Sequence, residues 1–92
     1  MLKIGRITLD NVTWTAIRPP IDCYHLRLYN PNTVGIKFRT LDTDASSELS
    51  INSLNDFSIK GTRALHLHTG SIVGYGQLVS GGPSSVVLIA EN

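Results

Sequence analysis

Short runs of alternating apolar and polar residues, separated by turn residues, limit what this chain can fold into. Leu26 and Leu28 alternate with Arg27 in residues 22–29, and a similar alternation follows in residues 34–39. A period of two places successive side chains on opposite faces of a strand. The sequence therefore predicts an all-β fold, a small antiparallel β-sandwich or jelly-roll-like barrel of about seven strands.

The turn residues between these runs predict how the strands pair. Asp10-Asn11 suits a tight turn between two strands, and residues 30–33 suit a second one, so we expect two hairpins in the first half. The expected strands are residues 4–9, 12–17, 22–29 and 34–39, followed by a three-stranded meander of 62–68, 72–79 and 85–90. Pro19-Pro20 lacks backbone donors, which favours a crossing between sheets there.

Two details of these strands are less regular. Gly74 and Gly76 flank Tyr75, which indicates a bulge or a close backbone approach, and we expect Tyr75 to lie at a sheet edge. Residues 42–57 allow either a short helix begun by Asp44 or short strands and loop, and weak helical spacing favours the strands.

Composition limits the size of the fold and the class of its partners. The chain has 92 residues, which fits a single β-domain over 1–92, and 41% of them are hydrophobic. Eight basic and seven acidic residues nearly cancel, so we expect no nucleic-acid partner. Cys23 is the only cysteine, which excludes a disulfide within the chain and is compatible with a reducing compartment.

The chain also shows no signal for a membrane. Lys3, Arg6 and Asp10 interrupt the first residues, unlike the apolar segment of a signal peptide. The longest apolar run, residues 86–90, is far shorter than the roughly 20 residues that span a bilayer. We expect no signal peptide and no membrane partner.

Two groups of residues have the chemistry of metal ligands. His66 and His68 lie two apart in a predicted strand, so both imidazoles would share one face. Asp42, Asp44 and Glu48 form an oxygen-rich loop without the spacing of an EF-hand. Because both ligand sets are incomplete, we expect solvent-facing or interface histidines, a solvated acidic turn, and no metal or other cofactor.

No arrangement of residues supports catalysis. No serine lies in a nucleophile elbow, and the glycines match neither a dinucleotide-binding nor a phosphate-binding loop. Cys23 alternates onto the face of His25, but no oxyanion element accompanies them, so a structural cysteine is expected. We predict no catalytic residues and no enzyme activity.

The terminal strand is apolar on both faces. Its residues Val86, Val87, Leu88 and Ile89 need cover on two sides, and another subunit could supply the second. They are therefore a possible subunit interface. A central strand buried within one chain explains the same pattern equally well.

The layout resembles that of small all-β virion-associated proteins of tailed bacteriophages, of the capsid decoration, cement or minor-fibre type. The features that carry it are Trp14 followed by Pro19-Pro20, the strands at 24–30 and 36–40, and Gly81-Gly82-Pro83 before residues 86–89. The resemblance implies a non-enzymatic structural protein, a homotrimer that binds the major capsid or another virion protein. It also implies assembly in the host cytoplasm and location in the virion.

A second class of function stays open, a carbohydrate- or ligand-binding β-domain. Aromatic rings offer an apolar face with a polar handle, and Trp14, Tyr24, Tyr29 or Tyr75 could present such stacking surfaces.

The incomplete ligand sets predict that folding needs neither zinc nor calcium. Excess chelator should leave the melting temperature, followed by circular dichroism, within about 1 °C of its starting value. A sharp drop that added metal reverses would instead establish a site at the histidines or the acidic loop.

Overall fold

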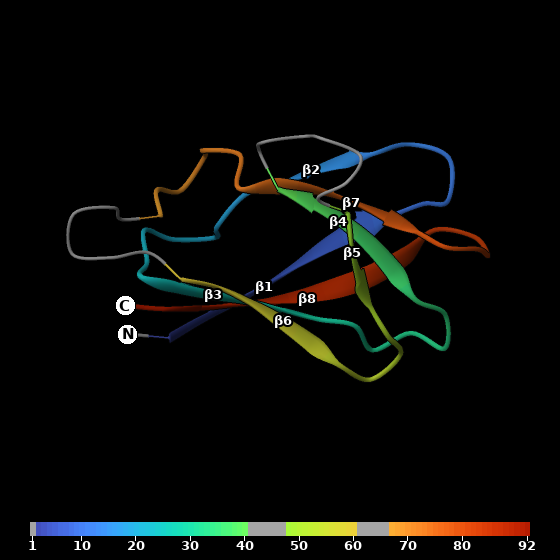
Figure 1. The fold of residues 1–92 in the computed structure, drawn as a ribbon. Helices are drawn as coiled ribbons and strands as arrows, with labels where there is room; N and C mark the ends of the chain where they lie inside the picture. Colours follow the sequence, from blue (N-terminus) through green and yellow to red (C-terminus); the bar gives the residue numbers. More distant parts are fainter. Residues whose placement is uncertain (1, 41–47, 61–66) are drawn as a thin grey trace.

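The computed structural model describes residues 2–40, 48–60 and 67–92, which form two facing four-stranded antiparallel sheets (Figure 1). Sheet A contains, in spatial order, β1 (Leu2–Leu9), β8 (Ser84–Glu91), β3 (His25–Tyr29) and β6 (Asp56–Lys60). Sheet B contains β2 (Thr15–Ile17), β7 (Gly74–Leu78), β4 (Ile36–Thr40) and β5 (Leu49–Ile51). The predicted all-β sandwich is confirmed, with eight strands in the described residues. Over the same ranges, no helix is long and apolar enough to cross a membrane.

The strand pairing follows one rule from the ends of the chain inward. β1 pairs with β8, β2 with β7, β3 with β6, and β4 with β5. Pairing of β3 with β8 and of β4 with β7 completes the two sheets. This is the strand order of an eight-stranded jelly roll, and it brings the chain termini side by side (Figure 1).

The predicted local pairings are wrong. β1 and β2 lie in different sheets, as do β3 and β4, and β7 and β8, so neither hairpin nor the meander forms; residues 62–66 of the expected meander lie outside the described residues. A turn signal shows that the chain bends but not which strand it pairs with afterwards. The carboxylate of Asp10 accepts N–H bonds from Val12 (2.9 Å) and Thr13 (2.6 Å), and this bend leads from sheet A to sheet B.

Other expectations are confirmed. The chain crosses between sheets in the segment that contains Pro19-Pro20. In the described part of residues 42–57 the structure has short strands, β5 and the first two residues of β6, joined by a turn. Asp44, the expected start of the alternative helix, lies outside the described residues.

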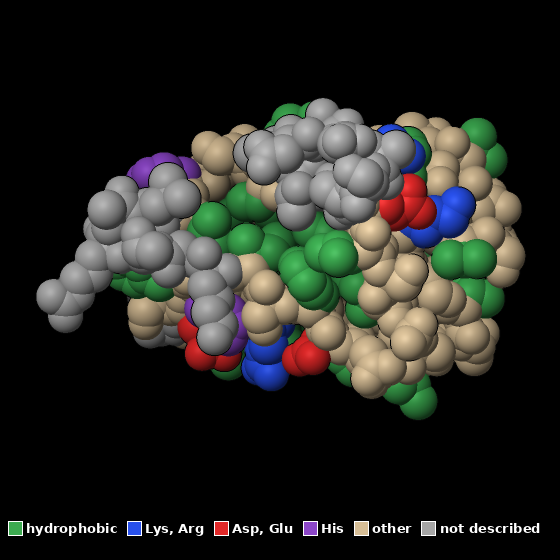
Figure 2. Space-filling model, viewed as in Figure 1, with side chains coloured by type: hydrophobic (Ala, Val, Ile, Leu, Met, Phe, Trp, Pro, Cys, Tyr) green, Lys and Arg blue, Asp and Glu red, His purple; other side chains and the backbone are tan. Residues whose placement is uncertain are grey.

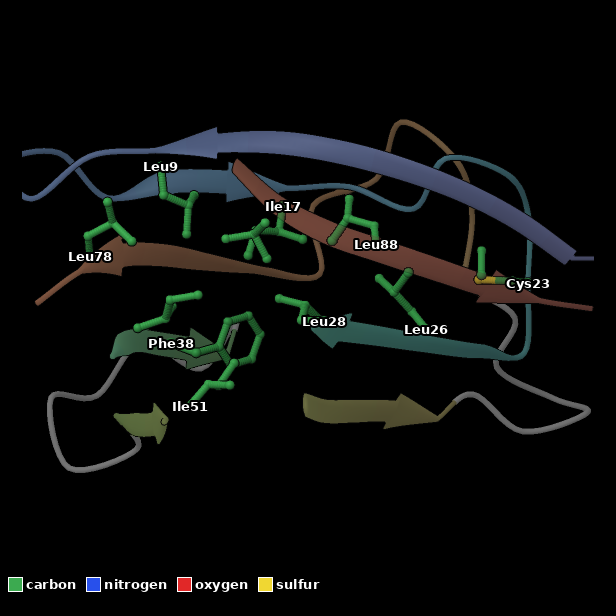
Figure 3. Close-up of a cluster of buried hydrophobic side chains, with 12 residues drawn as sticks. Leu9, Ile17, Cys23, Leu26, Leu28, Phe38, Ile51, Leu78 and Leu88 are labelled. Carbon is green, nitrogen blue, oxygen red and sulfur yellow. The ribbon is translucent and has the colours of Figure 1, made fainter. Parts of the chain in front are cut away.

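The core lies between the two sheets (Figure 3). Alternation on the strands places their apolar side chains inward, as the sequence predicted for Leu26 and Leu28 and for Ile36 and Phe38. The buried set is Leu9, Ile17, Cys23, Leu26, Leu28, Ile36, Phe38, Ile51, Leu78, Val86, Leu88 and Ala90. Burial of this surface is the main favourable contribution to folding.

Because Gly74 and Gly76 have no side chains, the backbone of β7 lies close to the side chains of Phe38 and Leu9. A Cβ at Gly74 would overlap the ring of Phe38, and one at Gly76 would lie 3.0 Å from Leu9. Both residues are paired regularly with β2 and β4, so the predicted close approach is confirmed and no bulge is needed. Tyr75 is correspondingly on an interior strand, and its prediction as an edge residue is wrong.

Asn30 is a fully buried polar residue at the end of β3. Its Nδ2 donates to the carbonyl oxygens of Val34 (2.8 Å) and Ile51 (3.2 Å), and its Oδ1 accepts from the N–H of Asn32 (3.0 Å). Ile51 ends β5 in sheet B, so one amide group links the two sheets.

Replacing Asn30 should therefore destabilise the sandwich. Asn30→Ala leaves the carbonyls of Val34 and Ile51 without this donor, and we expect a loss of about 3 kcal/mol in the free energy of unfolding. Urea denaturation measures it. Asn11→Ala, at an exposed position, is the control and should change stability by less than about 0.5 kcal/mol; equal effects of the two substitutions would contradict the role of Asn30.

Candidate functional site

The predicted interface segment contributes to two surfaces of β8. Val86 and Leu88 face the core of their own chain and are 0% and 4% exposed. Val87 and Ile89 point to the outer face of sheet A and are half-buried. β8 lies between β1 and β3, so it is a central strand of its sheet. Only Val87 and Ile89 are left to contact another molecule.

These two side chains continue into an apolar strip on β1. Ile89 pairs with Ile4, which is 57% exposed, and Leu2 on the same face of β1 is 58% exposed. We call Leu2, Ile4, Val87 and Ile89 the sheet A strip. Ile4 and Ile89 are direct partners, and Leu2 and Val87 are their diagonal neighbours on the same face, so the four side chains form an apolar strip; Arg6, opposite Val87, and Glu91, opposite Leu2, lie at its two ends.

Charged groups border the sheet A strip on the side of β3. Arg27 lies 3.6 Å from the carboxylate of Asp56 and 3.5 Å from that of Glu91. These side chains are 38%, 48% and 45% exposed, so the ion pairs contribute little to stability but give the strip a polar rim. The Nε of Arg27 and the Nε2 of His25 are buried without a hydrogen bond.

β1 is also the longest edge strand among the described residues. It has eight residues, whereas the edge strands β2 and β5 have three each and β6 has five. In the described part of the chain, its backbone hydrogen bonds go only to β8. A long edge with free backbone groups next to an apolar strip is favourable for pairing with another chain.

A different combination of side chains occupies the outer face of sheet B. The guanidinium carbon of Arg39 lies 4.1 Å from the ring centroid of Trp14, and its Nη2 lies 3.4 Å from Oε2 of Glu48. Tyr75 is the β7 residue opposite Arg39, and Gln77 is opposite Lys37. We call Trp14, Lys37, Arg39, Tyr75 and Gln77 the sheet B face.

The remaining aromatic residues do not join this group. Tyr29 lies on the outer face of sheet A, opposite Val87 and Asp56. Tyr24 precedes β3, is 41% exposed, and donates its backbone N–H to the carbonyl of Glu91. Of the four aromatic residues singled out from the sequence, the structure therefore brings only Trp14 and Tyr75 to one face.

Apolar side chains also reach the surface at the open edge of the sandwich, where β5 and β6 are the last strands of their sheets (Figure 2). Leu49 is 37% exposed, and Phe57 and Ile59 are half-buried against the core. The rings of Phe57 and Phe38 lie 5.5 Å apart and join this edge to the interior.

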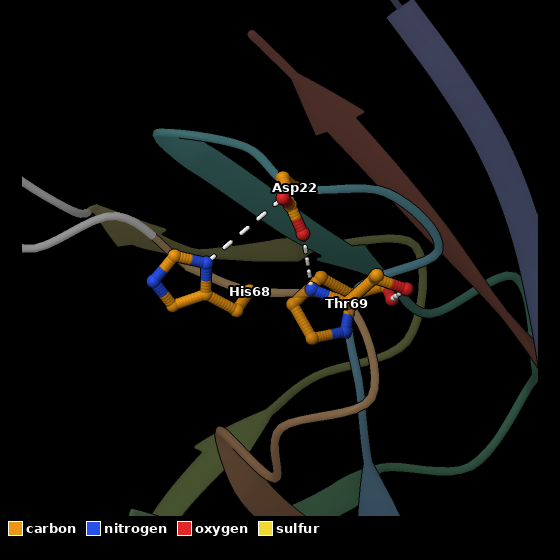
Figure 4. Close-up of polar contacts among 4 residues, drawn as sticks. Asp22, His68 and Thr69 are labelled. Carbon is orange, nitrogen blue, oxygen red and sulfur yellow. Dashed lines mark hydrogen bonds and ion pairs between the residues drawn. The ribbon is translucent and has the colours of Figure 1, made fainter.

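The histidine pair is only partly described, since His66 lies outside the described residues. Nδ1 of His68 is 3.9 Å from Oδ2 of Asp22, and Oδ1 of Asp22 accepts the backbone N–H of Thr69 at 2.7 Å (Figure 4). The hydroxyl of Thr69 donates to the Pro19 carbonyl at 3.1 Å. Asp22 thus ties the loop before β3 to the loop before β7.

No group of three or more His, Cys, Asp or Glu side chains in residues 2–40, 48–60 and 67–92 is placed to hold a metal ion. Asp42 and Asp44 of the acidic loop lie outside these ranges, while Glu48 pairs with Arg39. The prediction that folding needs no metal stays a prediction.

Cys23 lies in the core and not on the face of His25, so the sequence-based placement of these two residues on one face is wrong. It is 0% exposed, whereas His25 is half-buried on the outer side of β3. The alternation fails because Cys23 precedes β3 and exchanges backbone hydrogen bonds with Leu67 (2.8 Å each) instead. Burial raises the pKa of the Cys23 thiol, as expected for a structural cysteine.

No protein-family model, curated protein or solved structure matches this chain.

Burial and the raised pKa predict that Cys23 is chemically inert in the folded protein. A maleimide reagent at pH 7 should label the native thiol at least about 100-fold more slowly than the urea-unfolded one, since reaction needs an exposed thiolate. Mass spectrometry of timed samples gives both rates. Equal rates would mean that Cys23 is accessible and would reopen a reactive role.

Proposed function

We propose that this chain is a non-enzymatic structural protein of a virus particle, a capsid decoration or cement protein that acts as a symmetric homotrimer and stabilises the shell. The observation that carries the proposal is the sheet A strip, in which Leu2 and Ile4 are more than half exposed beside Val87 and Ile89. An exposed apolar strip with a polar rim is typical of a protein interface.

Symmetry explains how one narrow strip can be covered. Three copies arranged around a threefold axis can bring their strips together, which buries each strip without a different partner protein. The Arg27 ion pairs at the border stay in the polar rim, where they orient the subunits and keep their contact with water. The surfaces away from the axis remain available for the major capsid protein.

A carboxylate in the strip should separate the subunits. Ile89→Asp places a carboxylate between Ile4 and Arg27. We expect the association free energy to weaken by about 3 kcal/mol or more, because the carboxylate loses its water in the interface and Arg27 is already shared by Asp56 and Glu91. Light scattering after size exclusion should give a trimer for the wild type and a monomer of 10.0 kDa for Ile89→Asp.

Thr8→Asp is the matched control, because Thr8 shares the outer face of β1 but pairs with Ser85 beyond the strip. It should remain trimeric, and circular dichroism should show that both variants keep the β fold. A wild-type chain that stays monomeric at millimolar concentration would contradict self-assembly. A gene located among carbohydrate-processing genes, instead of capsid, portal and tail genes, would contradict the virion role.

A further inference from the structure

We propose that the sheet B face is a binding site for a sugar that carries a carboxylate, on the side of the sandwich opposite the assembly surface. The site consists of Trp14, Lys37, Arg39, Tyr75 and Gln77, from the adjacent strands β4 and β7 and the segment before β2. The proposal does not depend on self-assembly, because the sheet A strip lies on the outer face of the other sheet.

The register arranges these side chains as a flat platform. Tyr75 lies between Ala16 on β2 and Arg39 on β4, and Gln77 lies beside Lys37. Trp14 precedes Thr15, the partner of Gly76, so it falls on the β2 side of Gln77. With strands about 4.8 Å apart and same-face residues about 6.8 Å apart, the platform measures about 10 by 7 Å. That area accommodates one or two pyranose rings.

A sugar needs an apolar surface for its C–H groups and hydrogen-bond partners for its hydroxyl groups, and the aromatic residues and Arg39 supply them. Arg39 stacks on Trp14, so the ring of Tyr75 offers the apolar face for the C–H groups of a pyranose, and the small side chain of Ala16 leaves room beside it. Stacking on Trp14 and the contact with Glu48 hold the Arg39 guanidinium in place. A planar donor held in this way loses little entropy when it binds hydroxyl groups.

Gln77 and Arg39 place hydrogen-bonding groups on the platform. Gln77 is 9% exposed, and its side chain points to the outer face because its neighbours Gly76 and Leu78 face the core. On this face, the buried side-chain atom without a hydrogen-bond partner among the described residues is Nε of Arg39, although buried donors normally have partners. A sugar hydroxyl above the platform would accept from this Nε, and a second hydroxyl would bond to the amide of Gln77.

The charge of Lys37 indicates that the ligand is an anion. Glu48 balances the charge of Arg39, whereas Lys37 is half-buried between Gln77 and Ser50 and has no ion pair within the described ranges. A carboxylate on the sugar would supply that pair. A nucleic acid fits less well, because one uncompensated cation on the face and a net charge of +1 give little attraction for a phosphate backbone.

The test uses the fluorescence of Trp14, the only tryptophan in the chain. Trisaccharides of galacturonate, glucuronate and mannuronate are titrated against their carboxyl-reduced, neutral counterparts, with a dT12 oligonucleotide as a further arm. We expect a saturable change for at least one acidic trisaccharide and at least about tenfold weaker binding of its neutral form.

Three variants assign the contacts. Lys37→Gln should weaken binding of the acidic trisaccharide about tenfold and bring it to the level of the neutral one, while Lys3→Gln, a cation on the other sheet, should have no effect. Gln77→Leu should weaken binding, because it removes the amide that bonds to a sugar hydroxyl.

Ile89→Asp should bind the sugar as the wild type does, so failure of assembly and failure of this site are distinguishable. Equal binding of acidic and neutral trisaccharides, a response to the oligonucleotide alone, or no response to any probe would overturn the proposal. Retained discrimination between acidic and neutral sugars in Lys37→Gln would also overturn it.

Discussion

The junction between the two sheets contains the buried side-chain amide of Asn30, which needs hydrogen-bond partners. A primary amide removed from water is costly unless its donors and its acceptor all find partners. Asn30 directly follows β3 of sheet A, and its Nδ2 donates to the carbonyls of Val34, just before β4, and Ile51, at the end of β5. These bonds join the point where the chain leaves sheet A to two segments at the edge of sheet B. The apolar side chains of the core then fill the space that this junction sets.

The same sandwich presents two outer faces of different chemistry. On sheet A the sheet A strip is apolar, with the charges of Arg27, Asp56 and Glu91 at its border. On sheet B the outward residues are aromatic, amide and cationic, and Arg39 lies across β7 against Trp14. A jelly roll buries its inner faces and leaves both outer faces free to differ, so the proposed assembly surface and the proposed ligand surface occupy separate sheets.

Some residues of the two proposed surfaces could be recognised from the sequence, and others could not. Period-two alternation placed Val87 and Ile89 on the face opposite Val86 and Leu88, but the contribution of Leu2 and Ile4 depends on β1 lying beside β8. Trp14 and Tyr75 were recognised as stacking residues, whereas Arg39 and Gln77 were not, because their placement depends on β7 lying between β2 and β4. Cys23 was misplaced because alternation was extended beyond the end of β3, where pairing with Leu67 changes the direction of the side chain.

The sequence by itself determined the local properties of this chain. Alternation gave the strands and their inward side chains, the prolines gave a crossing between sheets, and Gly74 and Gly76 gave a close approach of backbone to core. Only the tertiary structure decided which strands pair. Turn residues at Asp10 and Asn30 are equally compatible with a hairpin and with a passage to the opposite sheet, since both reverse the chain. The strand pairing is the one that buries the inward apolar faces of all the strands at the same time. This condition involves the whole chain, and it pairs β1 with β8 although they are far apart in sequence.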